Sequence, residues 1–175
     1  MGKIFKLIAD EALHAEDASF YTKCQACNEA GVPVYTCHGK LIDIPNSDVY
    51  AACCDCLNQR RIKHIDECFM DKLIDEYSDN PEEEKNTLRM TPRIPMHMQG
   101  TDWPLCCGKL TEFTGSPKDI KELIEIQKRS IFWERKPNPQ EGCLAEEDGS
   151  PEVFDEVSEF RCFNCAKHYW VFQPT

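Results

Sequence analysis

The chain has 175 residues with 31 acidic and 20 basic side chains, and its formal net charge of −11 disfavours long-range attraction to nucleic acid or to an anionic membrane. No stretch approaches the roughly 18 consecutive apolar residues of a membrane span, and the first residues show no secretion-signal pattern. We therefore expect a cytoplasmic protein that forms one compact domain over residues 1–175.

Cysteine is the most informative residue type, with 12 copies in the chain. In a reducing compartment, regularly spaced cysteines are usually metal ligands rather than disulfide partners. Cys24 and Cys27 form a predicted turn, and a second pair, Cys53 and Cys56, follows after 25 intervening residues. Two such pairs supply the four thiolates of a closed tetrahedral site, and zinc is the metal that this arrangement favours.

The segments around the second pair are predicted from their apolar patterns. A short strand is expected over residues 31–37, and residues 41–44 continue it or pair with it. After Cys56 we expect one helix, because apolar residues follow at steps of three and four. The basic run at 60–64 is then an exposed helical face, as such runs usually are. The apolar stripe of this helix comprises Ile62, Ile65, Phe69 and Leu73.

The middle of the chain is polar and rich in proline. Residues 78–84 begin a short acidic helix at most, and residues 91–95 form an extended loop, because prolines and the residues before them resist helix. The whole proline-rich segment, residues 79–99, would be a loop that joins two parts of the domain, residues 20–78 and 100–175.

A second helix is predicted after Ser116. This residue is an N-cap candidate, Pro117 suits the first turn, and Asp119 completes a capping box. The expected buried side of the helix consists of Ile120, Leu123, Ile124 and Ile131.

The last elements are two strands, at 159–162 and 167–172, on either side of a third pair, Cys162 and Cys165. This pattern is typical of a zinc-ribbon hairpin. Cys106 and Cys107 are the expected partners of the third pair, so the chain would hold two zinc ions. The predicted fold is α+β: short β-hairpins and zinc-ribbon-like knuckles stapled by two zinc sites, with two main amphipathic helices.

Several residues of the second half stand in a characteristic order: Thr91, Pro92, Gln99, Trp103, Cys107, Gly108, Phe113 and Gly115, followed by residues 160–168. In this order they resemble the CbrC family, a group of bacterial proteins named for a role in colicin tolerance. The resemblance extends roughly from Cys24 to Tyr169. Cys24 and Cys27 match the family's early pair, and Cys53 and Cys56 match its later Cys-Pro-Trp-Cys motif with the middle residues changed.

The chain departs from the family where the second site is expected. The family motif after the tryptophan reads His-Cys with another cysteine four residues later, whereas this chain has Cys106 and Cys107, with Thr111 in the last place. The fourth ligand beside Cys107 and the third pair is then either Cys106, which we favour because a turn would let neighbouring cysteines face one ion, or His168, which stands three residues after Cys165.

The acidity of the C-terminal part and the resemblance favour a non-catalytic protein that neutralises a basic toxin such as a nuclease. The two alternatives are a zinc-ribbon module for nucleic acid, which the charge opposes, and a thiol redox protein that uses a Cys-x-x-Cys pair. No catalytic constellation is assembled in the sequence, so we do not expect an enzyme. The candidate docking residues are Glu146, Glu147, Asp148, Asp155 and Glu156.

The remaining cysteines have no paired spacing and are expected to pack as small buried side chains. Trp103, with Gln99 nearby, could line a pocket or cover a zinc knuckle. The unpaired cysteines are Cys37, Cys54, Cys68 and Cys143.

Overall fold

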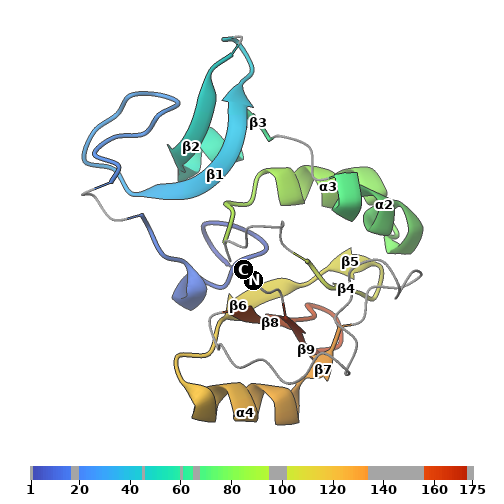
Figure 1. Ribbon diagram of the computed structural model, residues 1–175. Coiled ribbons are helices and arrows are strands. Elements are labelled where there is room, and N and C mark those ends of the chain that lie inside the picture. The colour runs from blue at the N-terminus through green and yellow to red at the C-terminus, as the bar shows by residue number, and fades with distance from the viewer. Residues whose placement is uncertain are drawn as a thin grey trace.

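The computed structural model describes residues 2–16, 20–44, 46–59, 61–64, 68–94, 102–133 and 156–172. In the view of Figure 1, one sheet lies at the top, a second lies below it, and helix α4 covers the bottom. The described elements, in chain order, are the 3-10 helix η1 (Asp10–Ala12), β1 (Val34–Leu41), β2 (Asp48–Cys53), α1 (Cys54–Asn58), β3 (Ile62–His64), α2 (Cys68–Tyr77), α3 (Pro81–Arg89), β4 (Leu105–Cys106), β5 (Lys109–Leu110), β6 (Glu112–Gly115), α4 (Ile120–Arg129), β7 (Ile131–Phe132), β8 (Val157–Arg161) and β9 (His168–Phe172).

The first sheet has the strand order β2-β1-β3, and both pairings are antiparallel. The prediction of one continuous helix after Cys56 is wrong. Helix α1 ends at Asn58, residues 62–64 form strand β3, and a separate helix, α2, starts at Cys68. Ile62 pairs with Leu41 on the free edge of β1. A β-branched residue at helical spacing suits a strand equally well, and the available edge decided between the two.

The second sheet has the order β6-β8-β9-β7. Strands β8 and β9 form the predicted hairpin, in register from Val157 opposite Phe172 to Arg161 opposite His168. The α+β class with short hairpins is therefore confirmed. A separate two-stranded hairpin, β4-β5, precedes this sheet in the chain.

The N-terminal segment connects the two sheets. The backbone N–H of Phe113 in β6 donates to the carbonyl of Leu7 at 2.8 Å, and the carbonyl of Phe113 accepts from Ala9 at 2.9 Å. Further along, the N–H of Glu16 donates to the carbonyl of Val34 at 2.8 Å. The segment thus pairs with a strand of each sheet.

Part of the predicted loop over residues 79–99 is helical. Helix α3 extends from Pro81 to Arg89, with its proline in the first turn, where a missing N–H does no harm. The carboxylate of Glu84 is buried and accepts the backbone N–H of Leu110 at 2.9 Å. This bond ties α3 to the β4-β5 hairpin, and the apparent loop is a structured bridge.

Helix α4 begins at Ile120, so the predicted N-cap at Ser116 is wrong. Asp119 is the N-cap, and its Oδ1 accepts the backbone N–H groups of Lys121 and Glu122, both at 2.9 Å. The Oε2 of Glu122 accepts the N–H of Lys118, the residue before this N-cap, at 2.9 Å, and the cap lies three residues beyond the predicted one.

The buried face of α4 is also narrower than predicted. Leu123 and Ile126 are buried, whereas Ile120, Ile124 and Ile131 are exposed. The prediction is correct for Leu123 alone. Residues three apart on a helix share a face, and it is the face of Leu123 and Ile126 that is covered.

One hydrophobic core extends across both sheets. The ring of Phe5 packs edge-on against Tyr35 of β1, with centroids 5.3 Å apart. In the second sheet, Phe160 contacts Trp103 at 5.3 Å and Phe113 at 5.5 Å. Within the described ranges, no helix has both the length and the apolar character that a membrane crossing requires.

Candidate metal centres

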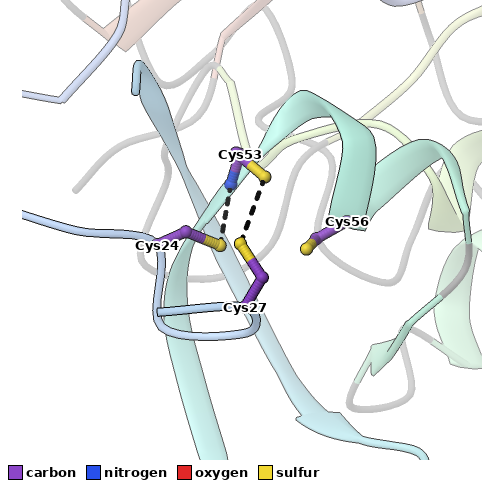
Figure 2. Close-up of side chains that lie close together, drawn as sticks. All are labelled: Cys24, Cys27, Cys53 and Cys56. Carbon is purple, nitrogen blue, oxygen red and sulfur yellow. Dashed lines mark hydrogen bonds between the residues drawn. The ribbon is translucent and has the colours of Figure 1, made fainter. Parts of the chain in front are cut away.

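The first cluster consists of Cys24, Cys27, Cys53 and Cys56, and it is called the core cluster below. The first two belong to a turn before β1, Cys53 ends β2, and Cys56 lies in α1. Figure 2 shows the four side chains directed toward one another from these three segments. Their sulfurs all lie within 4.8 Å of each other.

The distances in the core cluster fit a tetrahedral metal centre. Four sulfurs at about 2.3 Å from one ion are about 3.8 Å apart. The sulfurs of Cys27 and Cys53 are 3.9 Å apart. A disulfide would bring them to about 2.05 Å, and every cysteine whose side chain the structure describes is free. The residues present therefore fit a divalent metal ion.

Backbone groups prepare the core cluster for negative charge. The N–H of Cys53 donates to the sulfur of Cys24 at 3.3 Å. Burial raises the pKa of Cys24, but this N–H and those of Cys27 and Ala26 outweigh it and lower the pKa to about 7. Burial raises the pKa of Cys53 and Cys56, so four thiolates together need a cation.

Gln25 fixes the first Cys-x-x-Cys turn to the edge of strand β2. Its side-chain Oε1 accepts the backbone N–H of Tyr50 at 2.7 Å and that of Ala51 at 3.1 Å. The backbone N–H of Gln25 donates to the carbonyl of Ala51 at 3.1 Å. The turn is thereby held beside Cys53. No spacing rule singles out Gln25, since its role depends on the strand edge that it meets.

The second cluster, called the surface cluster below, consists of Cys106, Cys107, Cys162 and Cys165. The sulfur of Cys106 is 3.8 Å from that of Cys107 and 3.6 Å from that of Cys165. These distances also fit the tetrahedral value of about 3.8 Å. The hairpin β4-β5 supplies two of the sulfurs, and the turn between β8 and β9 supplies the other two.

A tight turn explains how two neighbouring cysteines face one centre. Cys106 pairs with Lys109, and the two residues between them, Cys107 and Gly108, have positive φ angles of 53° and 68°. This is the pattern of a type I′ hairpin. The carbonyl of Gly108 accepts bonds from the N–H of Asp79 at 2.9 Å and the Oγ of Ser78 at 3.1 Å. The end of α2 thus holds the turn in place.

The fourth member of the surface cluster is Cys106, and His168 lies outside it. The Nδ1 of His168 is 3.1 Å from the Oε1 of Glu159. The hydroxyl of Tyr169 donates to the sulfur of Cys106 at 3.0 Å. Burial raises the pKa of Cys106 to about 12 despite this donor. The pKa of Cys165 is lowered to about 7, mainly because its sulfur accepts the backbone N–H of Lys167.

The two clusters differ in burial. In the core cluster three of the four cysteines are buried and Cys27 is half-buried. In the surface cluster Cys162 is buried, Cys106 is half-buried, and Cys107 and Cys165 are exposed. The sets are chemically alike, but only the second contains fully exposed cysteines, Cys107 and Cys165.

Two positions singled out in the sequence have structural roles. Trp103 is buried and its Nε1 donates to the carbonyl of Thr111 at 2.6 Å. Thr111 is itself buried, and its hydroxyl donates to the carbonyl of Pro104 at 2.8 Å. It stands outside the surface cluster, and Cys106 completes the set in its place. Gln99 lies outside the described residues.

Of the unpaired cysteines, Cys37 is buried and donates to the carbonyl of Val49 at 3.7 Å. Burial, with a smaller effect of the charge on Cys24, raises its pKa to about 12, as for an inert thiol. Cys54 is half-buried, and its sulfur is 3.8 Å from the Oδ1 of Asp55. The side chains of Cys68 and Cys143 lie outside the described part of the chain.

The predicted docking face falls almost entirely outside the described residues. Of its five members the structure describes Glu156, whose side chain is buried, with 9% of its surface exposed. This carboxylate therefore does not contribute to an exposed acidic face. The other four members are Glu146, Glu147, Asp148 and Asp155.

Comparisons of the chain with family models, with curated proteins and with solved structures gave no match. The resemblance to the CbrC family therefore stays an expectation, and the geometry of the two clusters is what indicates a function.

Proposed function

We propose that the protein is a non-catalytic zinc-binding protein with two tetrathiolate zinc sites, the core cluster and the surface cluster. The observation that carries the proposal is the coincidence of two independent four-cysteine sets, each with all sulfurs within 4.8 Å. Four thiolates without histidine or an open position are the ligand set of a structural zinc site. Thiolates also favour soft metals over magnesium or calcium.

Metal analysis of the purified protein tests this proposal. We expect two zinc ions per chain, and about one after either Cys24→Ser or Cys162→Ser, because each substitution removes one ligand from a different site. Cys37→Ser is the control, since Cys37 belongs to neither set, and it should retain both ions. A single ion, or iron in place of zinc, would contradict the proposal.

The biological role that we propose is to bind a basic protein, such as a toxin or nuclease domain, and thereby to neutralise it. The support is the net charge of −11 and the resemblance to the CbrC family. Two tetrathiolate sites would each add roughly two further negative charges. An acidic protein associates quickly with a basic partner through electrostatic steering.

Recovery of bound proteins from the native cell tests this role. We expect a basic partner whose association rate falls as salt rises, because salt screens the attraction. Recovery of neutral or acidic partners alone would count against it. The same net charge opposes the nucleic-acid module, and absence of a gel shift at low salt would exclude that alternative.

A thiol redox protein is less well supported. Its pair Cys53 and Cys56 does precede a helix, but α1 is five residues long and both sulfurs belong to a set of four. A reversible disulfide between them in the isolated protein, with no zinc bound, would favour this alternative.

A further inference from the structure

We propose that the surface cluster is an exchange site, from which a small anionic thiol such as glutathione removes the metal, while the core cluster keeps its own. This inference rests on the zinc sites proposed above. It assigns to one of the two sites an activity in metal transfer.

Exposure distinguishes the two sites. Cys107 and Cys165 are exposed, whereas three sulfurs of the core cluster belong to buried residues. Replacement of one thiolate ligand by another needs an approach of the incoming sulfur to the ion. The surface cluster offers two exposed cysteines to this approach, whereas the core cluster offers only the half-buried Cys27, and its other three ligands become accessible after local opening.

An open pocket is lined in part by Cys107, one of the exposed cysteines. It has a volume of about 590 Å³ and lies between Tyr77 at the end of α2, the β4-β5 turn with Cys107, and residues 131–133. This volume is within the range of small-molecule sites, roughly 300–1,000 Å³. Cys107 therefore lines a space in which a small ligand fits.

Two exposed lysines stand close in the chain to the exposed cysteines of the surface cluster. The exposed Lys109 follows the turn that carries Cys107, and the exposed Lys167 follows Cys165 by two residues. In a chain with a net charge of −11, these two lysines are the cationic residues nearest in sequence to the exposed cysteines, and we take them as the contacts of the anionic group of the acceptor thiol.

The exchange step is balanced. The incoming thiol forms one sulfur–metal bond as the bond of the Cys107 sulfur breaks, and the proton of the incoming thiol passes to the Cys107 sulfur. No electrons are transferred, and no oxidant is needed. Repetition of the step at the other three sulfurs frees the ion as a complex with the acceptor thiols.

Zinc release from the two-zinc protein tests the proposal. With reduced glutathione and a zinc-sensitive dye, we expect one ion to leave at a rate that rises with glutathione concentration. The second ion should leave at least about tenfold more slowly, because it needs local opening. Equal rates for both ions, or a first rate independent of glutathione, would overturn the proposal.

Alkylation with N-ethylmaleimide, added in excess over glutathione once the first ion has been released, identifies the site. After loss of the first ion, the label should be found on Cys106, Cys107, Cys162 and Cys165, and labelling of the core cluster first would refute the assignment. Metal content is measured before the experiment. A protein that binds fewer than two zinc ions at this stage contradicts the proposed function, whereas a two-zinc protein that fails the release test contradicts the exchange proposal alone.

Two variants test the pocket, and a further comparison tests the charge. Ile131→Trp places a bulky ring at the pocket lining and should slow release, whereas Ile120→Trp, on an equally exposed isoleucine of α4, should not; the exposed fractions are 52% and 54%. Lys109→Gln with Lys167→Gln should slow release by glutathione more than release by neutral 2-mercaptoethanol. Equal behaviour in either comparison contradicts that part of the proposal.

Discussion

Asn28 and Ala166 occupy equivalent positions, each directly after the second cysteine of a Cys-x-x-Cys turn, and both have a left-handed backbone with φ angles of 62° and 56°. The hydrogen bonds of the two turns also match. The N–H of Asn28 donates to the carbonyl of Cys24 at 2.9 Å, and that of Ala166 to the carbonyl of Cys162 at 3.2 Å. The two clusters thus share one knuckle geometry, built from unrelated flanking residues.

This geometry predicts that Ala166→Gly stabilises the protein. An alanine at positive φ is strained by about 1–2 kcal/mol, and glycine relieves this strain. Glycine also raises the entropy of the unfolded chain, which lowers stability by about 0.4–1 kcal/mol, so the net gain in stability should be roughly 0.5–1 kcal/mol. Urea unfolding of the metal-loaded protein measures it. Asn28→Gly should gain less, because asparagine tolerates this conformation better than alanine does.

The control is Ala30→Gly, at an exposed position without positive φ. It should destabilise the protein, because glycine there relieves no strain. Equal effects of Ala166→Gly and Ala30→Gly would show that the left-handed backbone at Ala166 carries no strain.

Removal of metal should weaken the structure around the core cluster more than around the surface cluster. An ion at a thousandfold excess over its dissociation constant adds about 4 kcal/mol to folding. Cys24→Ser removes a fully buried sulfur and leaves a hydroxyl in the core, whereas Cys165→Ser acts on an exposed turn. We expect the larger fall in melting temperature for Cys24→Ser. A larger fall for Cys165→Ser would mean that the surface cluster dominates stability.

Gln25 should matter through its carbonyl oxygen. Gln25→Ala removes the acceptor of two backbone N–H groups on the edge of β2 and should lower the free energy of unfolding by about 1–2 kcal/mol. Gln25→Glu retains an acceptor at the same reach and should recover most of the loss. Urea unfolding compares the three proteins, and equal stability of wild type and Gln25→Ala would contradict this anchoring role.

The two cysteine clusters were the most predictable part of the molecule. Cys-x-x-Cys spacing is a local property, because a tight turn aims both sulfurs at one point, and the structure places the cysteines of each predicted set together. The pairing of Cys106 with Cys107 needed the left-handed turn at Cys107 and Gly108, for which the glycine was the available signal. Tyr169 and its bond to Cys106 had no signal, because the contact depends on the register of β9.

The errors in secondary structure have specific causes. Residues 62–64 satisfied a helical spacing, but the open edge of β1 captured them as β3. At α4, two capping pairs overlap, since Asp119 ends one and begins the next. The N-cap of the second formed, with Asp119 accepting the N–H groups of Lys121 and Glu122, while the Oε2 of Glu122 accepts the N–H of Lys118 at 2.9 Å. Local propensity alone does not distinguish these alternatives, because both are favourable.

Buried Glu159 should make stability depend on acid through its pairing with Arg129. Burial raises the pKa of Glu159, but the guanidinium, which donates to both carboxylate oxygens at 2.8 and 2.6 Å, and the hydroxyl of Ser130 lower it below its usual value. The pKa of glutamate in the unfolded chain is about 4.3. Because the folded pKa of Glu159 is lower, the ionised carboxylate stabilises the fold at pH values above about 4.3, and this stabilisation is lost as the pH falls through the folded pKa.

Arg129→Gln should therefore destabilise the protein at pH 7 by about 1–2 kcal/mol, a value that allows for the exposure of half the arginine side chain. The difference from wild type should persist down to about pH 5 and shrink below about pH 4.3, as the unfolded glutamate and then the folded one take up a proton. Because acid also displaces metal from thiolates in both proteins, the measured quantity is the difference in unfolding free energy at each pH. Lys128→Gln removes an ion pair with Glu125 in which both side chains are exposed. Its unfolding free energy should therefore differ from that of wild type by close to zero at every pH. A constant difference for Arg129→Gln across this range would show that the arginine acts by packing and not by charge.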